Sequence, residues 1–239
     1  MRYLGGKSRI AKRIAAHLEA LAAPGVLIED RFCGALSVAA AIKHRPLRVA
    51  DANAALVCTL RAVQDGWVPP ESLSEAEYAV LKATRDPTDP LTAFAAAGCS
   101  FGGSWFSGYA GTARRSSGDY TYAAMASRSL LRKCGALGNV RVECADYRYP
   151  TPVAGDICYL DPPYANAAGY PACEDFDHEE FWNVATAWAR SGVIVRVSEY
   201  AAPAGWVAVE SFGDVQVLGR SRGAEKIRAD YLWKHEAGR

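Results

Sequence analysis

The chain has 239 residues, half of them apolar, and its 27 basic and 26 acidic side chains give a formal net charge of +1. This length is enough for one or two domains with a buried core, and a charged fraction of 22% excludes an intrinsically disordered chain. No stretch approaches the roughly 18 consecutive apolar residues of a membrane span, and the first residues lack the apolar core of a signal peptide. We therefore expect a cytoplasmic protein with no membrane partner.

The cysteines and histidines indicate neither a disulfide framework nor a metal site. The seven cysteines are odd in number and contain no Cys-x-x-Cys pair, so we expect reduced, mostly buried thiols. The four histidines are scattered, which excludes a His-Glu-x-x-His helix and a zinc knuckle.

The net charge hides an uneven distribution along the chain. Residues 1–13 carry five bases and no acid, and residues 82–141 carry eight bases against three acids. Residues 142–180 reverse the sign, with nine acids and one base. This pattern is typical of a protein with one surface for phosphates and another for a cationic ligand, although solvated helix faces would give it equally well.

The first part of the chain predicts the opening unit of a doubly wound α/β sheet. Residues 26–28 are predicted to form a short apolar strand that runs into a turn at residues 29–34, and residues 35–43 are expected to be helical. A second strand at 47–50 ends at Asp51. A strand, a glycine turn, a helix and a strand with a terminal carboxylate are typical of nucleotide-binding sheets.

A mainly helical insert then interrupts the sheet. Helices are predicted at 55–64, 74–84 and 122–134, with a loop rich in Gly, Ser and aromatic residues at 98–111. Strands resume at 140–142, 157–160, 193–198 and 206–210. We expect a catalytic domain formed by residues 1–54 and 138–239, with residues 55–137 inserted between its halves.

The most specific motif is Asp161-Pro162-Pro163-Tyr164, directly after a buried strand. Two prolines cannot continue a sheet, so the backbone is rigid where ligands gather at strand ends. The motif resembles the Asp-Pro-Pro-Tyr of adenine-N6 DNA methyltransferases. Asp161 and the Pro162 carbonyl suit acceptance of two N–H groups from an exocyclic amine, which would aim its lone pair at a methyl donor. The Tyr164 ring offers a face for a flipped base.

Three further segments are similar to Dam-like, phage-type members of this family. Tyr3, Gly5, Gly6 and Lys7 resemble its amino-terminal motif for S-adenosylmethionine, and they are not a P-loop, because no strand precedes them. Asp30-Arg31-Phe32-Cys33-Gly34 resembles the Glu-Pro-Phe-x-Gly loop, with Asp for Glu, Arg for Pro, and Ala35-Leu36 in place of later glycines. Asp51 and Asn53 match an Asp-x-Asn that binds the ribose. Cofactor contacts are thus implied for Tyr3, Gly5, Gly6, Lys7, Asp30, Phe32, Gly34, Asp51, Asn53 and Asp161.

Two other segments are open to more than one interpretation. Asp146 and Tyr147 lie where the resemblance implies the cofactor adenine, but a surface turn is an equal alternative. Asp177 and His178 resemble a family segment for closing or base binding, yet we favour a helix cap in front of core residues Phe181 and Trp182.

The basic insert predicts contact with double-stranded DNA. In the 98–111 loop, Ser104, Trp105 and Tyr109 suit entry into DNA beside a flipped base, and Arg114 and Arg115 follow it. Arg128, Arg132 and Lys133 share a helical spacing that would follow a phosphate backbone, and Lys12 belongs to the basic start. A packed aromatic loop is the alternative.

The resemblance implies an α/β, Rossmann-like S-adenosylmethionine-dependent methyltransferase sheet with an inserted helical target-recognition domain. The implied activity is site-specific adenine-N6 methylation of duplex DNA by a monomer or weak dimer with no obligate protein partner. The alternatives are a DNA-binding descendant without catalysis and a methyltransferase acting on RNA or protein glutamine.

Overall fold

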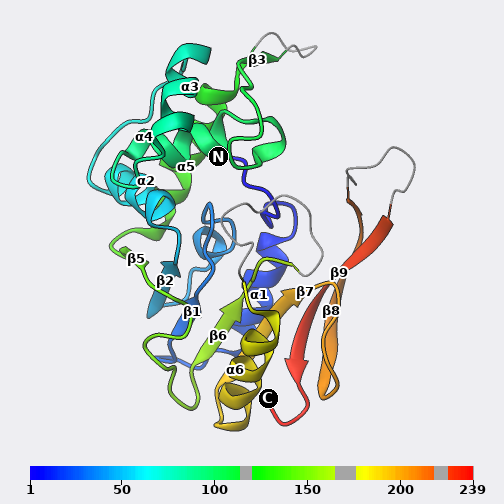
Figure 1. The fold of residues 1–239 in the computed structure, drawn as a ribbon. Coiled ribbons are helices and arrows are strands. Elements are labelled where there is room, and N and C mark those ends of the chain that lie inside the picture. The colour runs from blue at the N-terminus through cyan, green and yellow to red at the C-terminus, as the bar shows by residue number, and fades with distance from the viewer. Residues whose placement is uncertain (114–119, 165–175, 218–225, 239) are drawn as a thin grey trace.

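The computed structural model describes residues 1–113, 120–164, 176–217 and 226–238. Its main feature is a seven-stranded sheet with the strand order β5-β2-β1-β6-β7-β9-β8 (Figure 1). The strands are β1 (Ile28–Asp30), β2 (Leu47–Asp51), β5 (Val142–Cys144), β6 (Ile157–Leu160), β7 (Ile194–Glu199), β8 (Trp206–Val217) and β9 (Lys226–His235).

The first five strands of the order are parallel, and the last two are not. β5, β2, β1, β6 and β7 pair in parallel, whereas β9 pairs antiparallel with both β7 and β8. Parallel strands require crossovers that cover both faces of a sheet. The predicted α/β class is therefore confirmed.

Two helices cover opposite faces of the sheet around β6. α1 (Ala11–Leu21) belongs to the core cluster that contains Ile157 and Tyr159, and α6 (His178–Arg190) to the cluster that contains Cys158 and Leu160. Because alternate residues of a strand point to opposite faces, the two helices lie on opposite sides of the sheet, with α6 in front in Figure 1.

The chain between β2 and β5 is mainly helical, as predicted. It contains α2 (Ala54–Gln64), α3 (Glu75–Thr84), α4 (Pro90–Ala93), η2 (Phe94–Gly98, a π-helix), η3 (Phe101–Gly103, a 3₁₀ turn) and α5 (Tyr122–Leu137), with a two-stranded ribbon of β3 (Thr112–Ala113) and β4 (Tyr120–Thr121). Figure 1 shows these helices above the carboxyl ends of the parallel strands. Leu56, Phe94 and Leu130 belong to the same core cluster as Val49 and Val142 of the sheet.

Side-chain caps fix where several of these helices begin. Asn53 accepts a hydrogen bond from Leu56 N at the start of α2, and Ser74 forms a capping box with Glu77 at the start of α3. Asp177 accepts from Glu180 N at the start of α6, and Phe181 is buried. The capping interpretation of Asp177 is thus confirmed.

Three sequence-based expectations differ from the structure. No α-helix follows β1; turns lead into a 3₁₀ turn, η1 (Ala39–Ala41), because Gly34 and Leu36 have φ of 47° and 60°, outside the helical region. β1 ends at Asp30, two residues beyond the predicted strand. β9 was not predicted, although it fills the place between β7 and β8. Among the residues that the structure describes, no helix is both long and apolar enough to cross a membrane.

Candidate functional site

A cavity of about 580 Å³ opens at the carboxyl ends of β2, β1 and β6. β1 and β6 are neighbours in the sheet, but the chain leaves them toward opposite sides, to β2 and β7. Such a switch point is where ligands bind in open α/β sheets, and the volume suits a cofactor-sized molecule. Of the predicted cofactor and catalytic residues, the cavity wall includes Tyr3, Gly5, Gly6, Lys7, Asp30, Phe32, Gly34, Asp51, Asn53, Asp146, Tyr147, Asp161, Pro162 and Pro163.

Lys7 is held in this cavity by a carboxylate of the protein itself. Its Nζ lies 2.7 Å from Asp161 Oδ1 and 3.9 Å from Asp230 Oδ2, and it donates to Gly5 O at 3.1 Å. Burial opposes its charge, but Asp161 and Asp230 hold the pKa of Lys7 above its usual value. Lys7 is therefore an ion-pair partner of Asp161 in the same cavity wall where the resemblance implied that it contacts the cofactor.

Asp161 comes directly after β6, and its titration depends on Lys7. Burial raises the pKa of Asp161 to about 6, while the charge and hydrogen bond of Lys7 act in the opposite direction. Lys7 thus keeps Asp161 ionised at neutral pH, the form that accepts hydrogen bonds through both oxygens.

Tyr164 is buried and does not belong to the cavity wall. Its hydroxyl donates to Asp230 Oδ1 at 2.8 Å, Lys7 Nζ lies 4.4 Å from its ring centre, and Tyr200 packs perpendicular to it at 4.6 Å. The ring face predicted to stack on a base is thus occupied by the Lys7 ammonium.

Asp30 ends β1 with a carboxyl group that is 1% exposed. Its Oδ1 has no hydrogen-bond partner among the described residues. Burial, together with the charges of Asp161 and Asp51, raises its pKa to about 8. An unpartnered carboxyl oxygen in a cavity wall is suited to a ligand that donates hydrogen bonds or carries positive charge.

Asp51 ends β2 and organises the neighbouring turns. Its Oδ2 accepts from Gly34 N and its Oδ1 from Asn53 N, each at 2.9 Å. The Gly34 turn lies against the Tyr3 ring, where a Cβ at residue 34 would come within 3.4 Å. Each oxygen of Asp51 keeps a further lone pair, so the carboxylate can also accept from two vicinal hydroxyls.

Aromatic rings form another wall of the cavity. Phe32 stacks on Tyr147 with ring centres 5.2 Å apart, and Phe176 contacts both rings. Asp146 is engaged by Arg148, which donates through Nε at 2.8 Å and Nη2 at 2.9 Å. A hydrogen bond from an adenine amino group to Asp146 would therefore compete with this ion pair.

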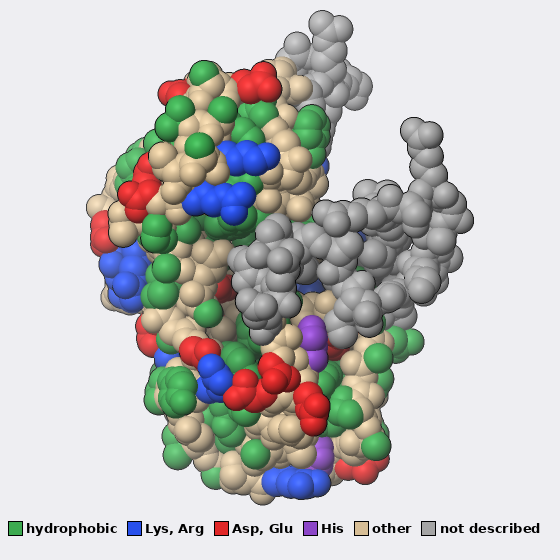
Figure 2. Space-filling model, in the orientation of Figure 1, with side chains coloured by type: hydrophobic (Ala, Val, Ile, Leu, Met, Phe, Trp, Pro, Cys, Tyr) green, Lys and Arg blue, Asp and Glu red, His purple; other side chains and the backbone are tan. Residues whose placement is uncertain are grey.

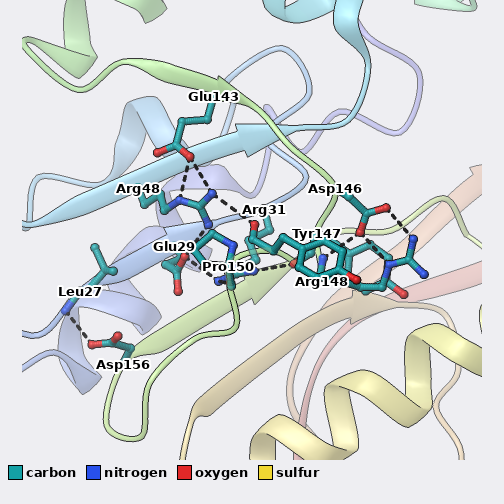
Figure 3. A network of polar contacts seen from close by, with 11 residues as sticks. Leu27, Glu29, Arg31, Arg48, Glu143, Asp146, Tyr147, Arg148, Pro150 and Asp156 are labelled. Atoms are coloured by element: carbon teal, nitrogen blue, oxygen red, sulfur yellow. Dashed lines mark hydrogen bonds and ion pairs between the residues drawn. The ribbon is translucent and has the colours of Figure 1, made fainter.

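Arg31, which was expected only as a departure from the family loop, anchors a buried network of polar contacts (Figure 3). It is 1% exposed, lies 2.8 Å from Glu29 Oε2, and donates to Tyr147 O at 2.5 Å and Pro150 O at 2.7 Å. Arg48 bridges Glu29 to Glu143 at 3.0 and 2.6 Å. Arg31 thereby fixes the backbone that carries Asp146 and Tyr147.

Apart from Lys133, the predicted DNA-binding residues divide into three groups. Lys12, Arg128 and Arg132 are exposed, and Arg114 and Arg115 lie outside the described residues. Ser104, Trp105 and Tyr109 are half-buried: Trp105 belongs to the cavity wall, and the Tyr109 hydroxyl donates to Leu73 O at 2.5 Å.

The prediction that Lys133 follows a phosphate backbone is wrong. Its side chain is buried and its Nζ donates to Ala35 O at 2.7 Å and Ser37 Oγ at 2.9 Å. Burial, with Arg132 nearby, lowers its pKa to about 8. Lys133 lies on the face of α5 that points away from solvent. Its hydrogen bonds connect that helix to the turn after β1.

The charge on the face of the molecule drawn in Figure 2 agrees with the uneven distribution of charge along the sequence. Figure 2 shows acidic side chains gathered on the part of the molecule that carries α6, in keeping with the acidic segment 142–180. On this part of the molecule, Arg148 Nη1 forms an ion pair with Glu180 Oε1 at 2.7 Å.

Comparison with known proteins yields a distant structural likeness. No family model matches the chain, and no curated protein matches it. The similar solved structures include two of the rRNA methyltransferase AviRa from Streptomyces viridochromogenes, at 15% and 13% identity with TM-scores of 0.42 and 0.40. Each match covers 98% of this chain and 87% of AviRa.

Arg31→Ala should lower the free energy of unfolding by roughly 3–5 kcal/mol, because it leaves Glu29 as a buried charge with fewer partners. Chemical denaturation followed by circular dichroism measures this. Arg141→Ala is the matched control, since Arg141 pairs with Asp65 on the surface and its loss should change stability little. Equal effects of the two substitutions would contradict the role of Arg31.

The raised pKa of Asp30 predicts a loss of stability as the pH rises. Between a pH of about 4 and about 8 the folded protein keeps a proton on Asp30 that the unfolded chain has released, so the free energy of unfolding falls across this window. Asp30→Asn should reduce that fall, whereas Asp65→Asn, at an exposed carboxyl group, should leave it unchanged. Denaturation at several pH values tests this, and an unchanged slope in Asp30→Asn would refute it.

Proposed function

We propose that the protein is an S-adenosylmethionine-dependent methyltransferase that modifies the N6 amino group of adenine in duplex DNA. The observation that carries this proposal is the position of Asp161-Pro162-Pro163. These residues follow β6 and share one cavity wall with Asp30 and Asp51, which end the two neighbouring strands.

The residues of the cavity fit this cofactor. S-adenosylmethionine supplies an electrophilic methyl group on a positively charged sulfur. Asp161 gives the cavity negative charge, and the unpartnered Asp30 Oδ1 can accept a hydrogen bond from an ammonium group, whose positive charge would favour the ionised form of Asp30. Asp51 can accept from the two ribose hydroxyls, and the stacked Phe32 and Tyr147 offer an apolar surface for an aromatic base.

Asp161 and Pro162 can orient the amino group of the target. The lone pair of an exocyclic adenine nitrogen is delocalised into the ring, so the nitrogen is a poor nucleophile. Acceptance of one N–H by Asp161 and of the other by the Pro162 carbonyl favours a pyramidal nitrogen whose lone pair faces the methyl group. S-adenosylmethionine would supply the methyl group and keep the electron pair of its carbon–sulfur bond on sulfur, and Asp161 would take the proton that the nitrogen loses.

The overall reaction is tested with methyl-labelled S-adenosylmethionine and mixed-sequence duplex DNA. We expect the label in N6-methyladenine. Calorimetric titration with the cofactor separates the alternatives: failure to bind it would leave a DNA-binding protein without catalysis, and label in RNA or in protein glutamine would assign a different substrate. Sequencing of modified bases in an expressing host would give the recognition sequence.

Asp161→Ala should abolish methyl transfer while DNA binding persists, because the acceptor of the amino proton is lost. Single-turnover methylation and a DNA mobility shift measure the two properties separately. Wild-type transfer by Asp161→Ala would exclude the assigned role.

The rate should rise with pH through about 6, since Asp161 must be ionised to accept the amino hydrogen. Lys7→Met removes the charge that lowers the pKa of Asp161, so the acidic limb should move to higher pH, and Lys7→Arg should largely restore it. The measurement is the pH dependence of single-turnover rates at saturating cofactor. An acidic limb that stays in place in Lys7→Met would contradict the coupling of these side chains.

A further inference from the structure

Asp230 is a buried carboxyl group that lies close to the cavity without belonging to its wall. It lies on β9, the strand that was not predicted from the sequence. β9 runs antiparallel to β7, and Tyr231 lies opposite Glu199, the last residue of β7. Asp230 therefore comes just beyond the carboxyl end of β7, at the same edge of the sheet as the cavity.

The side chain of Asp230 points to the face of the sheet that carries α1. Leu232, two residues along β9, belongs to the core cluster that contains Tyr159 and the buried residues of α1. Because every second residue of a strand points to the same face, Asp230 lies on that face as well. β9 thus brings a carboxylate to the Lys7 ammonium from a distant part of the chain.

Each oxygen of Asp230 faces a different group. Oδ1 accepts from the Tyr164 hydroxyl at 2.8 Å, and Oδ2 lies 3.9 Å from Lys7 Nζ. Lys7 Nζ in turn lies 2.7 Å from Asp161 Oδ1 and 4.4 Å from the centre of the Tyr164 ring. Two carboxylates therefore share one ammonium group, and Asp230 holds that group both directly and through the Tyr164 ring.

The charge of Asp230 acts on Asp161 in the direction opposite to that of Lys7. Burial raises the pKa of Asp161 to about 6; among the neighbouring charges, Lys7 lowers this pKa and Asp230 raises it. A base must be ionised at the working pH, but it accepts a proton more readily when its pKa is higher. Lys7 serves the first requirement and Asp230 the second.

Among the described residues, the other titratable groups that face this cluster include a carboxyl group and three tyrosines: Asp30 of β1, Tyr159 of β6, Tyr164 after β6 and Tyr200 after β7. Burial raises the pKa values of Tyr159 and Tyr164 well above the usual value, so both hydroxyls are neutral at neutral pH. Asp30 has a pKa of about 8, which burial and the charge of Asp161 raise. The titration near pH 6 therefore belongs to Asp161.

We propose that Asp230 is a positioning residue for methyl transfer, which holds Lys7 and Tyr164 in place beside Asp161 and shares the charge of Lys7 with it. This inference rests on the proposed function. Asp161 remains the group that takes the proton of the amine, and Asp230 acts on it through Lys7 and Tyr164. With Lys7 shared between two carboxylates, Asp161 is a stronger proton acceptor than it would be with Lys7 to itself.

Asp230→Asn tests this role, because it removes the charge while the amide oxygen can still accept from Tyr164. The acidic limb of the single-turnover rate should move to lower pH by about one unit, opposite to the shift expected for Lys7→Met. Above this limb the rate should fall roughly threefold to tenfold, since Asp161 becomes a weaker proton acceptor. Calorimetric affinity for S-adenosylmethionine should not change, because Asp230 lies outside the cavity wall.

Two variants serve as controls. Asp230→Glu keeps the negative charge, so its acidic limb should stay close to that of the wild type. Asp156→Asn is the matched control, since Asp156 precedes β6 at the opposite end of the strand and accepts from Leu27 N at 3.4 Å (Figure 3). Its acidic limb should stay in place.

Carbon-13 NMR of the Asp161 carboxyl group gives a readout that does not depend on methyl transfer. The pKa of Asp161 should fall in Asp230→Asn and remain unchanged in Asp156→Asn. Circular dichroism checks that each variant is folded. If Asp230→Asn does not fold, Asp230→Ser asks the same question, because its hydroxyl can also accept from Tyr164 and carries no charge.

The outcomes separate this inference from the proposed function. A wild-type protein that transfers no methyl group to DNA overturns both. Methyl transfer by the wild type, with an acidic limb and an Asp161 titration that stay in place in Asp230→Asn, overturns the inference alone. A slower rate with an unmoved limb would give Asp230 a purely structural role and would also overturn it.

Discussion

Three carboxyl groups buried at one edge of the sheet set the main electrostatic constraint on this protein. Asp51, Asp30 and Asp161 end or follow the adjacent strands β2, β1 and β6, and all three have raised pKa values because burial disfavours their charge. Such an arrangement is stable only where cations, hydrogen bonds or protons compensate for it. The cost of burial is offset differently for each of the three carboxyl groups, and each is therefore suited to a different kind of ligand group.

Asp161 is paired with Lys7, Asp51 is bound by two backbone N–H groups, and Asp30 retains an unpartnered oxygen. An ionised carboxylate suits acceptance from an amine, a carboxylate fixed by backbone suits hydroxyl groups, and an unpartnered oxygen suits a cationic donor. The cavity is therefore prepared for a ligand that is positively charged at one end and polar at the other. This charge distribution is the physical reason for proposing S-adenosylmethionine.

Buried cations outside the cavity hold its walls in place. Arg31 fixes the backbone at Tyr147 and Pro150, and Lys133 fixes the turn at Ala35 and Ser37. The sequence analysis interpreted Arg31 as a departure from the family loop and Lys133 as a contact to DNA phosphates. Both long side chains point inward and hydrogen-bond to backbone carbonyls that no regular strand or helix satisfies. A helical spacing identifies residues that share a helix but does not tell which of them faces solvent.

The α/β class, most strand and helix positions, and more than half of the residues of the cavity wall could be predicted from the sequence alone. Apolar runs, caps and turn residues act locally, and the carboxyl ends of parallel strands always meet at one edge of the sheet. The place of β9, the pairing of Lys7 with Asp161 and the inward direction of Lys133 became evident only from the three-dimensional arrangement. These features depend on contacts between segments distant in the chain, such as residues 7 and 161 or 35 and 133, and no local pattern of residues encodes such contacts.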